Sequence, residues 1–122
     1  IDNTPLIDQG LKVDVYDKSL ITPALVARWA EFQRAPGHRE ILMSINALNQ
    51  MAATTERVAK ISVPTLVIHG EADVLIELSS SRRMAAAIPG ARLLVYPQVG
   101  HLPQIEIPQR SAADVAEFLV GH

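Results

Sequence analysis

The sequence predicts an α/β fold in which parallel strands alternate with helices. Two apolar runs rich in branched residues, 65–69 and 91–97, have the length and composition of buried strands. Each run is followed by a segment with helical spacing of apolar residues, 79–88 and 108–120. Consecutive strands joined by a helical crossover lie parallel in one sheet, with a right-handed connection. Residues 61–122 therefore predict the order strand, helix, strand, helix.

Serine, proline and glycine mark the ends of these elements. Ser79 is expected to cap the first of the two helices, and Pro89-Gly90 is expected to end it. Pro108 opens the last helix, where its missing N–H is tolerated. The buried stripe of the last helix is predicted to consist of Ala112, Val115, Phe118 and Leu119.

Two parallel strands do not make a stable sheet. Each strand would expose a row of unpaired backbone donors and acceptors at its free edge. The sequence therefore predicts that other strands of the same sheet lie outside these 122 residues.

Residues 1–60 are predicted to form a separate helical segment, with a boundary near residue 60. Residues 1–16 show no sustained period and are expected to form a loop. A helix is predicted to begin at Thr22 as N-cap, followed by Pro23, and to end at Pro36-Gly37. Its apolar face is predicted to consist of Leu25, Trp29 and Phe32.

A second amphipathic helix is predicted from His38 to about Ala53. Because a Pro-Gly turn joins it to the first helix, the two are expected to form an antiparallel pair. A short helical turn over 55–60 then leads into the first strand. The apolar stripe of the second helix is predicted to consist of Ile41, Ile45, Leu48 and Ala52, with Leu42 beside it.

Composition and charge exclude several classes of partner and site. A formal net charge of -2 offers no basic field to nucleic acid. No apolar stretch approaches the roughly 18 residues that span a bilayer. The absence of cysteine excludes disulfides and thiolate metal sites. The sequence names no compartment, and the cytoplasm is our working expectation.

One acidic and one imidazole side chain follow the two predicted strands. Asp73 comes just after the first strand, and Gly100-His101 comes just after the second. Because the carboxyl ends of parallel strands open at one edge of a sheet, the two side chains are expected to meet there. Histidine accepts and returns protons near neutral pH, and a carboxylate on its Nδ1–H fixes the tautomer. The pair predicts the acid and the base of a hydrolytic triad whose nucleophile lies elsewhere.

Several segments together resemble one known family. The stretches 63–73 (VPTLVIHGEAD), 88–91 (IPGA), 100–101 (GH) and 106–108 (EIP) occur in the order found in the C-terminal third of an α/β-hydrolase. The resemblance implies that residues 61–122 are the last two strands and helices of that fold. It also implies a catalytic order of Ser, then Asp or Glu, then His along the chain.

The resemblance extends more loosely to the first half. It implies that residues 4–60 form the cap inserted after the preceding strand, with Ile1-Asp2 as the end of that strand. The segment 16–23 and the turn 36–39 are similar to the cap of small lipases and esterases of the family.

The sequence departs from the family pattern in one large respect. It contains no Gly-x-Ser-x-Gly elbow and no oxyanion-hole segment. The nucleophile is therefore expected in an N-terminal half of the core that lies outside this sequence. That missing half is the expected partner of the chain. The 122 residues alone are expected to be incomplete for catalysis.

The resemblance implies a serine hydrolase of small carboxylic esters. A serine would attack the ester carbonyl, His101 would accept its proton and later activate water, and Asp73 would hold the imidazole. No metal or organic cofactor is required. Leu75 and Leu102, next to the pair, are expected to line an acyl pocket.

Three alternatives stay open. A carbon–carbon bond hydrolase of β-diketone-like acids would keep the serine, whereas an epoxide hydrolase or dehalogenase would replace it with aspartate. A non-catalytic interaction module that keeps the scaffold belongs to a different class. For the remaining polar residues, His69 is expected to pack at its strand end, Glu106 to support the His101 loop or the last helix, and Ser79–Ser81 to begin a helix without acting as nucleophile.

Overall fold

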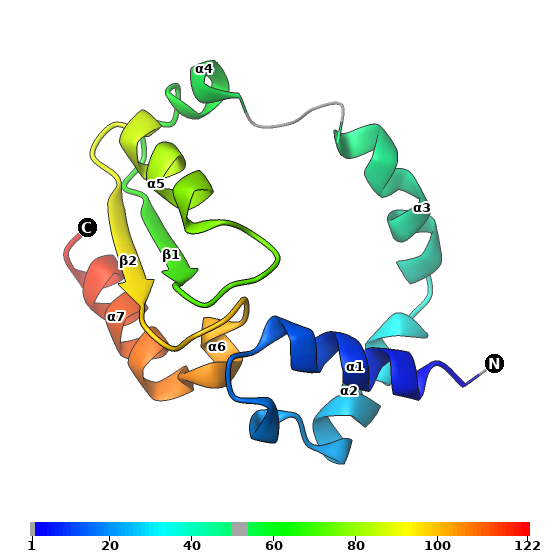
Figure 1. Cartoon of the computed structure of the whole chain (residues 1–122). Coiled ribbons are helices and arrows are strands. Elements are labelled where there is room, and N and C mark those ends of the chain that lie inside the picture. The colour runs from blue at the N-terminus through cyan, green and yellow to red at the C-terminus, as the bar shows by residue number, and fades with distance from the viewer. Residues whose placement is uncertain (1, 50–53) are drawn as a thin grey trace.

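A computed structural model describes residues 2–49 and 54–122 of the chain. In the second half of the chain, strands and helices follow one another in the predicted order (Figure 1). The first half begins with a helix that was not predicted. The elements are α1 (Thr4–Asp14), the 3-10 turn η1 (Lys18–Leu20), α2 (Pro23–Gln33), α3 (His38–Asn49), α4 (Thr55–Val58), β1 (Leu66–Gly70), α5 (Leu78–Ala87), β2 (Arg92–Tyr96), α6 (Pro103–Glu106) and α7 (Pro108–Val120).

The two strands lie parallel, which confirms the predicted pairing. Leu66 stands opposite Arg92, and Gly70 stands opposite Tyr96. Helix α5 lies on one side of the pair and α7 on the other (Figure 1). Both strands end at the same edge, so the loops that follow them open side by side. Among the described residues the sheet has only these two strands.

Helix α1 corrects the expectation of a loop over residues 1–16. Pro5 occupies its first turn, where the absence of an N–H is tolerated. Ile7 and Leu11 are buried one helical turn apart, and both belong to the same apolar cluster as α2. The helix is stabilised by this tertiary contact, which the polar and charged residues between Ile7 and Leu11 obscure in the sequence.

Helix α2 begins as predicted, and two residues of its predicted apolar face, Leu25 and Trp29, are half-buried against the apolar cluster. The Thr22 hydroxyl accepts a hydrogen bond from the backbone N–H of Leu25 (3.2 Å), which confirms the N-cap. Val26 and Ala30 are the buried residues of the helix. Phe32, predicted to be in the core, is 54% exposed, because the face that packs on α1 is centred on Val26 and Ala30.

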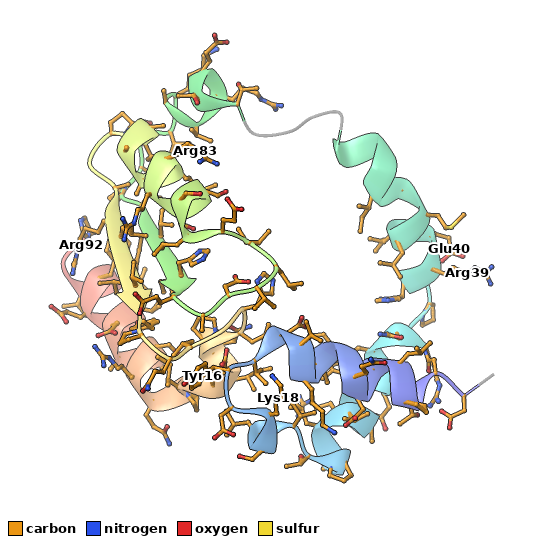
Figure 2. All side chains as sticks on the ribbon, viewed as in Figure 1. Tyr16, Lys18, Arg39, Glu40, Arg83 and Arg92 are labelled. Carbon is orange, nitrogen blue, oxygen red and sulfur yellow. The ribbon has the colours of Figure 1, made fainter. Side chains whose placement is uncertain are left out.

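Helix α3 corrects the expectation of an antiparallel pair with α2. It stands apart from the strand pair (Figure 1), and Arg39 and Glu40 project from its outer side (Figure 2). Of its predicted apolar stripe, Ile41, Leu42 and Ile45 are exposed. Helix α2 packs mainly on α1, so among the described residues these apolar side chains of α3 stay exposed. The side chain of Leu48, and Ala52, lie outside the described residues.

One apolar cluster joins the N-terminal helices to the C-terminal half. Leu102, which follows the second strand and its loop, is buried together with residues of α1 and α2, and Ile105 packs against them. The cluster therefore fixes the N-terminal helices to the loop that carries His101. Its buried members are Ile7, Leu11, Val15, Ile21, Val26, Ala30 and Leu102.

Helix α7 buries less of its predicted stripe than expected. Phe118 is buried, but Ala112, Val115 and Leu119 are exposed. Ala112 and Val115 line an open hollow of about 570 Å³ together with Ile68 of β1. Ala112 and Val115 therefore face this hollow, and no other strand or helix of the described residues covers them.

Two smaller expectations also change. The predicted loop over 98–107 contains the short helix α6, opened by Pro103. Ser79 does not cap α5, because Glu77 holds the N-cap position without a side-chain capping bond. The Ser79 hydroxyl instead donates to the Glu77 carboxylate (3.2 Å). Among the helices described, none combines the length and apolarity needed to cross a bilayer.

Candidate active site

Asp73 is held by its own loop at the carboxyl end of β1. Its backbone N–H donates to the Gly70 carbonyl (3.0 Å), which closes a tight turn directly after the strand. Its Oδ1 accepts from the backbone N–H groups of Leu75 (2.8 Å) and Ile76 (3.0 Å). The side chain is only 5% exposed. Local bonds therefore fix the carboxylate and leave Oδ2 to face the neighbouring loop.

The structure brings Asp73 and His101 together. The Nδ1–H of His101 donates to Asp73 Oδ2 at 2.8 Å, while the imidazole remains 37% exposed. Burial of the Asp73 carboxyl raises its pKa, but hydrogen bonds from His101 and from two backbone N–H groups outweigh burial and bring the pKa below its ordinary value. An ionised carboxylate on Nδ1 leaves Nε2 as the ring nitrogen available for proton transfer.

Glu106 supports the His101 loop, which confirms one of the two roles predicted for it. Its carboxylate accepts the backbone N–H of Gly100 on both oxygens (2.9 and 3.0 Å) and that of Leu102 (3.2 Å). The same carboxylate accepts the N–H of Tyr16 (2.7 Å), which comes directly after α1 and its C-cap residue. Figure 2 shows Tyr16 where the N-terminal segment meets α6. Glu106 thus joins the base loop to the N-terminal helices.

Glycine is required where the two loops and α1 approach one another. A Cβ on Gly70 would overlap the carbonyl oxygens of Val99 and Gly100, and a Cβ on Gly100 would overlap the carbonyl oxygen of Asp14. That carbonyl of Asp14 accepts the backbone N–H of His101 at 2.6 Å. The end of α1 is therefore a direct support of the base.

The side chain of Asp14 adds a second carboxyl group near the pair. Burial raises its pKa, the His101 imidazole lowers it, and the negative charge of Asp73 raises it again. The net effect is a pKa above the ordinary value. The environment of Asp14 thus disfavours its charge, whereas that of Asp73 favours ionisation.

The two predicted pocket residues have different surroundings. Leu75 is 52% exposed in the loop after Asp73. Leu102 is 8% exposed and packs in the cluster with α1 and α2. His101 itself lines the hollow of about 570 Å³ beside α7, together with Pro103 and Gln104. The acyl-pocket role of the two leucines stays a prediction.

Sequence reasoning missed the contribution of α1, whereas His69 packs at its strand end as predicted. The carbonyl of Asp14 reaches His101 through the backbone, so its residue type carries no signal. His69 lies buried behind Asp73, with its Nε2 3.9 Å from Asp73 Oδ2. Its position four residues before the acid was the available signal for this proximity. Across residues 2–49 and 54–122, no group of three or more His, Cys, Asp and Glu side chains is placed to hold a metal ion.

Comparison with known proteins establishes the family. The family model described as serine aminopeptidase S33, an α/β-hydrolase model, matches residues 35–108. This chain belongs to the α/β-hydrolase family. The predicted fold class is thereby confirmed, and the family is one of hydrolases.

Curated relatives within the family match both halves of the chain. A 2-hydroxy-6-oxononadienedioate/2-hydroxy-6-oxononatrienedioate hydrolase of Comamonas testosteroni is 37% identical over 103 residues, which are 82% of this chain and 36% of the relative. A 2-hydroxymuconate semialdehyde hydrolase of Pseudomonas putida is 31% identical over 89% of this chain and 41% of the relative. The chain thus spans 36–41% of the length of these two α/β-hydrolases.

Solved structures give the same picture. A meta-cleavage product hydrolase from Pseudomonas fluorescens IP01 superposes on 99% of this chain with a TM-score of 0.84 and 30% identity. The chain covers 47% of that protein. The arrangement of helices and strands in this chain, with α3 apart from the strand pair, is therefore similar to that in a solved structure.

Proposed function

We propose that this chain supplies the acid and the base of a carbon–carbon bond hydrolase that acts on 2-hydroxy-6-oxo-dienoate acids. One observation supports the proposal above all: the relatives that match 82–89% of the chain are named as hydrolases of such acids. This replaces ester hydrolysis as the preferred activity and takes up one of the alternatives left open by the sequence.

The geometry of the pair suits this reaction. A nucleophile supplied by the rest of the core attacks the 6-oxo carbonyl and passes its proton to His101 Nε2, while Asp73 stabilises the imidazolium. The acid is cleaved in its 2-oxo form, in which the proton of the 2-hydroxyl group has moved to C5. When the C5–C6 bond breaks, its electron pair is delocalised onto the 2-oxo group, and the imidazolium returns the proton to the dienolate that leaves. Water then releases the acyl group with His101 as base.

The hollow beside α7 is the surface on which we expect a partner of the chain to pack. His101 lines it with the exposed residues Ala112 and Val115 and with Ile68 of β1, a strand that pairs only with β2 among the described residues. We propose that the N-terminal half of the hydrolase core packs here, adds strands to β1 and brings the nucleophile to His101. Residues 4–60 are then the cap above the site, and the apolar side chains of α3 face substrate or core.

Ester hydrolysis is the second candidate. Lipase 3 of a Moraxella strain is 33% identical over 52% of this chain, and a thermophilic esterase of Thermogutta terrifontis superposes on 55% of it with a TM-score of 0.53. These likenesses extend over about half of the chain. They favour a shared catalytic core and do not reach across the whole N-terminal helical segment.

The test uses the complete hydrolase core with these residues. Turnover of 2-hydroxy-6-oxo-6-phenylhexa-2,4-dienoate is followed by loss of dienol absorbance, and turnover of a p-nitrophenyl ester is followed in parallel. We expect cleavage of the dienoate at the higher kcat/KM and its near abolition by His101→Ala. His122→Ala, at the exposed C-terminus, is the matched control and should retain full activity. A preference for the ester would overturn the carbon–carbon assignment.

A further inference from the structure

A second imidazole lies behind the acid. His69, the fourth residue of β1, has a side chain that is 5% exposed. Its Nδ1 lies 2.7 Å from the hydroxyl of Ser81 in α5, and its Nε2 lies 3.9 Å from Asp73 Oδ2. Among the described residues, Nε2 of His69 is the buried side-chain polar atom that has no hydrogen-bond partner. A polar atom left in this way demands an explanation.

The surroundings of Nε2 fix the place of the ring proton. A deprotonated Nε2 would point a lone pair at the Asp73 carboxylate, which is repulsive in a desolvated site. A protonated Nε2 points the positive end of an N–H dipole at the same carboxylate. Nδ1 is then the acceptor, and the Ser81 hydroxyl donates to it at 2.7 Å. The Ser81 hydroxyl can donate as well as accept, and its donation to Nδ1 stabilises the tautomer that suits Asp73.

We propose that His69 is a positioning residue for the acid of the pair and that Ser81 sets its tautomer. The proposal rests on the proposed roles of Asp73 and His101. Two backbone N–H groups already hold Oδ1 of the carboxylate, whereas His101 holds Oδ2 from one side. The N–H of His69 faces Oδ2 from a second direction. It holds Oδ2 toward His101 and stops the carboxylate from turning away.

The first experiment observes the tautomer directly. Histidine is labelled with ¹⁵N in the complete hydrolase, and two-bond N–H couplings identify the protonated nitrogen of each ring. We expect a neutral Nε2–H tautomer at His69 and a mixture of tautomers in Ser81→Ala. Ser79→Ala, an exposed serine on the same helix, is the matched control and should leave the tautomer unchanged. An Nδ1–H tautomer, or one that Ser81→Ala does not affect, overturns the proposal.

The second experiment tests the effect on the pair. His69→Leu removes the N–H at similar volume, whereas His69→Gln can place an amide N–H where Nε2 lies. We expect His69→Leu to lower kcat roughly tenfold with KM unchanged and to shift the Nδ1–H resonance of His101. His69→Gln should restore most of kcat and of that resonance. If the glutamine and leucine variants fold equally well but are equally slow, or if neither differs from wild type, His69 does not position the acid.

The two proposals fail in different ways. If the complete protein cleaves neither the dienoate nor the ester, the proposed function is wrong. The tautomer of His69 and the Nδ1–H resonance of His101 remain measurable in that case and decide whether His69 orients Asp73.

Discussion

The loop after β1 and the loop after β2 hold their functional side chains by different means. Asp73 depends on bonds within its own loop, to Gly70, Leu75 and Ile76. His101 depends on distant parts of the chain, because Glu106 and the carbonyl end of α1 support its backbone. The acid loop is also joined to the end of β2 and the base loop, because the N–H groups of Glu71 and Ala72 donate to the carbonyls of Tyr96 (2.8 Å) and Val99 (2.9 Å). The base additionally requires the N-terminal helices to be docked. The two loops should therefore respond to different perturbations.

The largest effect is expected where the loops meet. Asp73→Asn in the complete hydrolase should lower kcat roughly 10⁴-fold, because an amide no longer fixes the imidazole tautomer. KM and the melting temperature should change little, since the Oδ1 bonds to backbone N–H groups can remain. Steady-state kinetics and thermal unfolding check this. Loss of stability with a normal kcat would show that Asp73 is a structural residue.

Glycine substitutions should separate packing from chemistry. Gly100→Ala forces a Cβ onto the Asp14 carbonyl and should destabilise the protein by about 1–3 kcal/mol while it displaces the base loop from α1. Gly10→Ala is the control, since a Cβ there meets nothing within 4 Å and the residue lies within α1. That change should raise stability by roughly 0.5–1 kcal/mol. Urea unfolding measures both, and equal behaviour of the two variants would refute the close docking.

Removing the charge of Glu106 should loosen the base loop and spare the acid loop. Glu106→Gln weakens charge-assisted bonds to the N–H groups of Gly100, Leu102 and Tyr16, with an expected loss of about 1–3 kcal/mol. Hydrogen exchange should rise at those amides and stay unchanged at Leu75 and Ile76. The exposed Glu117 provides the control substitution. A uniform rise in exchange across both loops would contradict the separation.

Lowering the pH should change the stability contributions of Asp73, in the acid loop, and of Asp14, at the end of α1, with opposite sign. Asp73 has a lowered pKa, so its contribution to stability is present above the ordinary value of 3.8 and is lost as pH falls through the folded-state pKa. Asp14 has a raised pKa, so its contribution is present below 3.8 and is lost as pH rises through the folded-state pKa. Stability profiles between about pH 2 and 6 for Asp73→Asn and Asp14→Asn should therefore diverge from wild type in opposite directions.

The smallest effect is expected at Tyr96, where β2 ends and the base loop begins. Its hydroxyl donates to Asp114 at 2.6 Å, and burial together with that carboxylate raises the pKa of Tyr96 to about 12. Stability from this bond is full below the ordinary value of 10.0 and is lost as pH rises towards 12. Tyr96→Phe should cost about 1 kcal/mol and flatten the profile in that range. Kinetics at neutral pH should stay unchanged.

The parts of the site that the sequence predicted are those built from neighbouring residues. Asp73 and His101 follow apolar runs whose pairing as parallel strands is a simple rule, so their meeting was predictable. The supports of His101 were not, because a backbone carbonyl and a docking helix have no residue pattern of their own. Glu106 was predicted to support either the loop or the last helix, but its bond to Tyr16 was not foreseen.

The helices show the same limit. The cap of α2 at Thr22 depends on adjacent residues and was predicted correctly. The exposure of α3, and of Val115 in α7, depends on which surfaces find a partner, and helical spacing alone cannot say that. For α1 the error was the reverse, since Ile7 and Leu11 gain their burial from α2.

The bond between Glu106 and Tyr16 joins positions 90 residues apart, and this has a consequence for the order of folding. Closing so long a loop costs conformational entropy before any contact rewards it. The turn that holds Asp73 closes over a few residues and can form at once. During synthesis the N-terminal helices emerge long before the carboxylate that anchors them. We expect a newly made chain to close the Asp73 turn before the support of His101 by the N-terminal segment is complete.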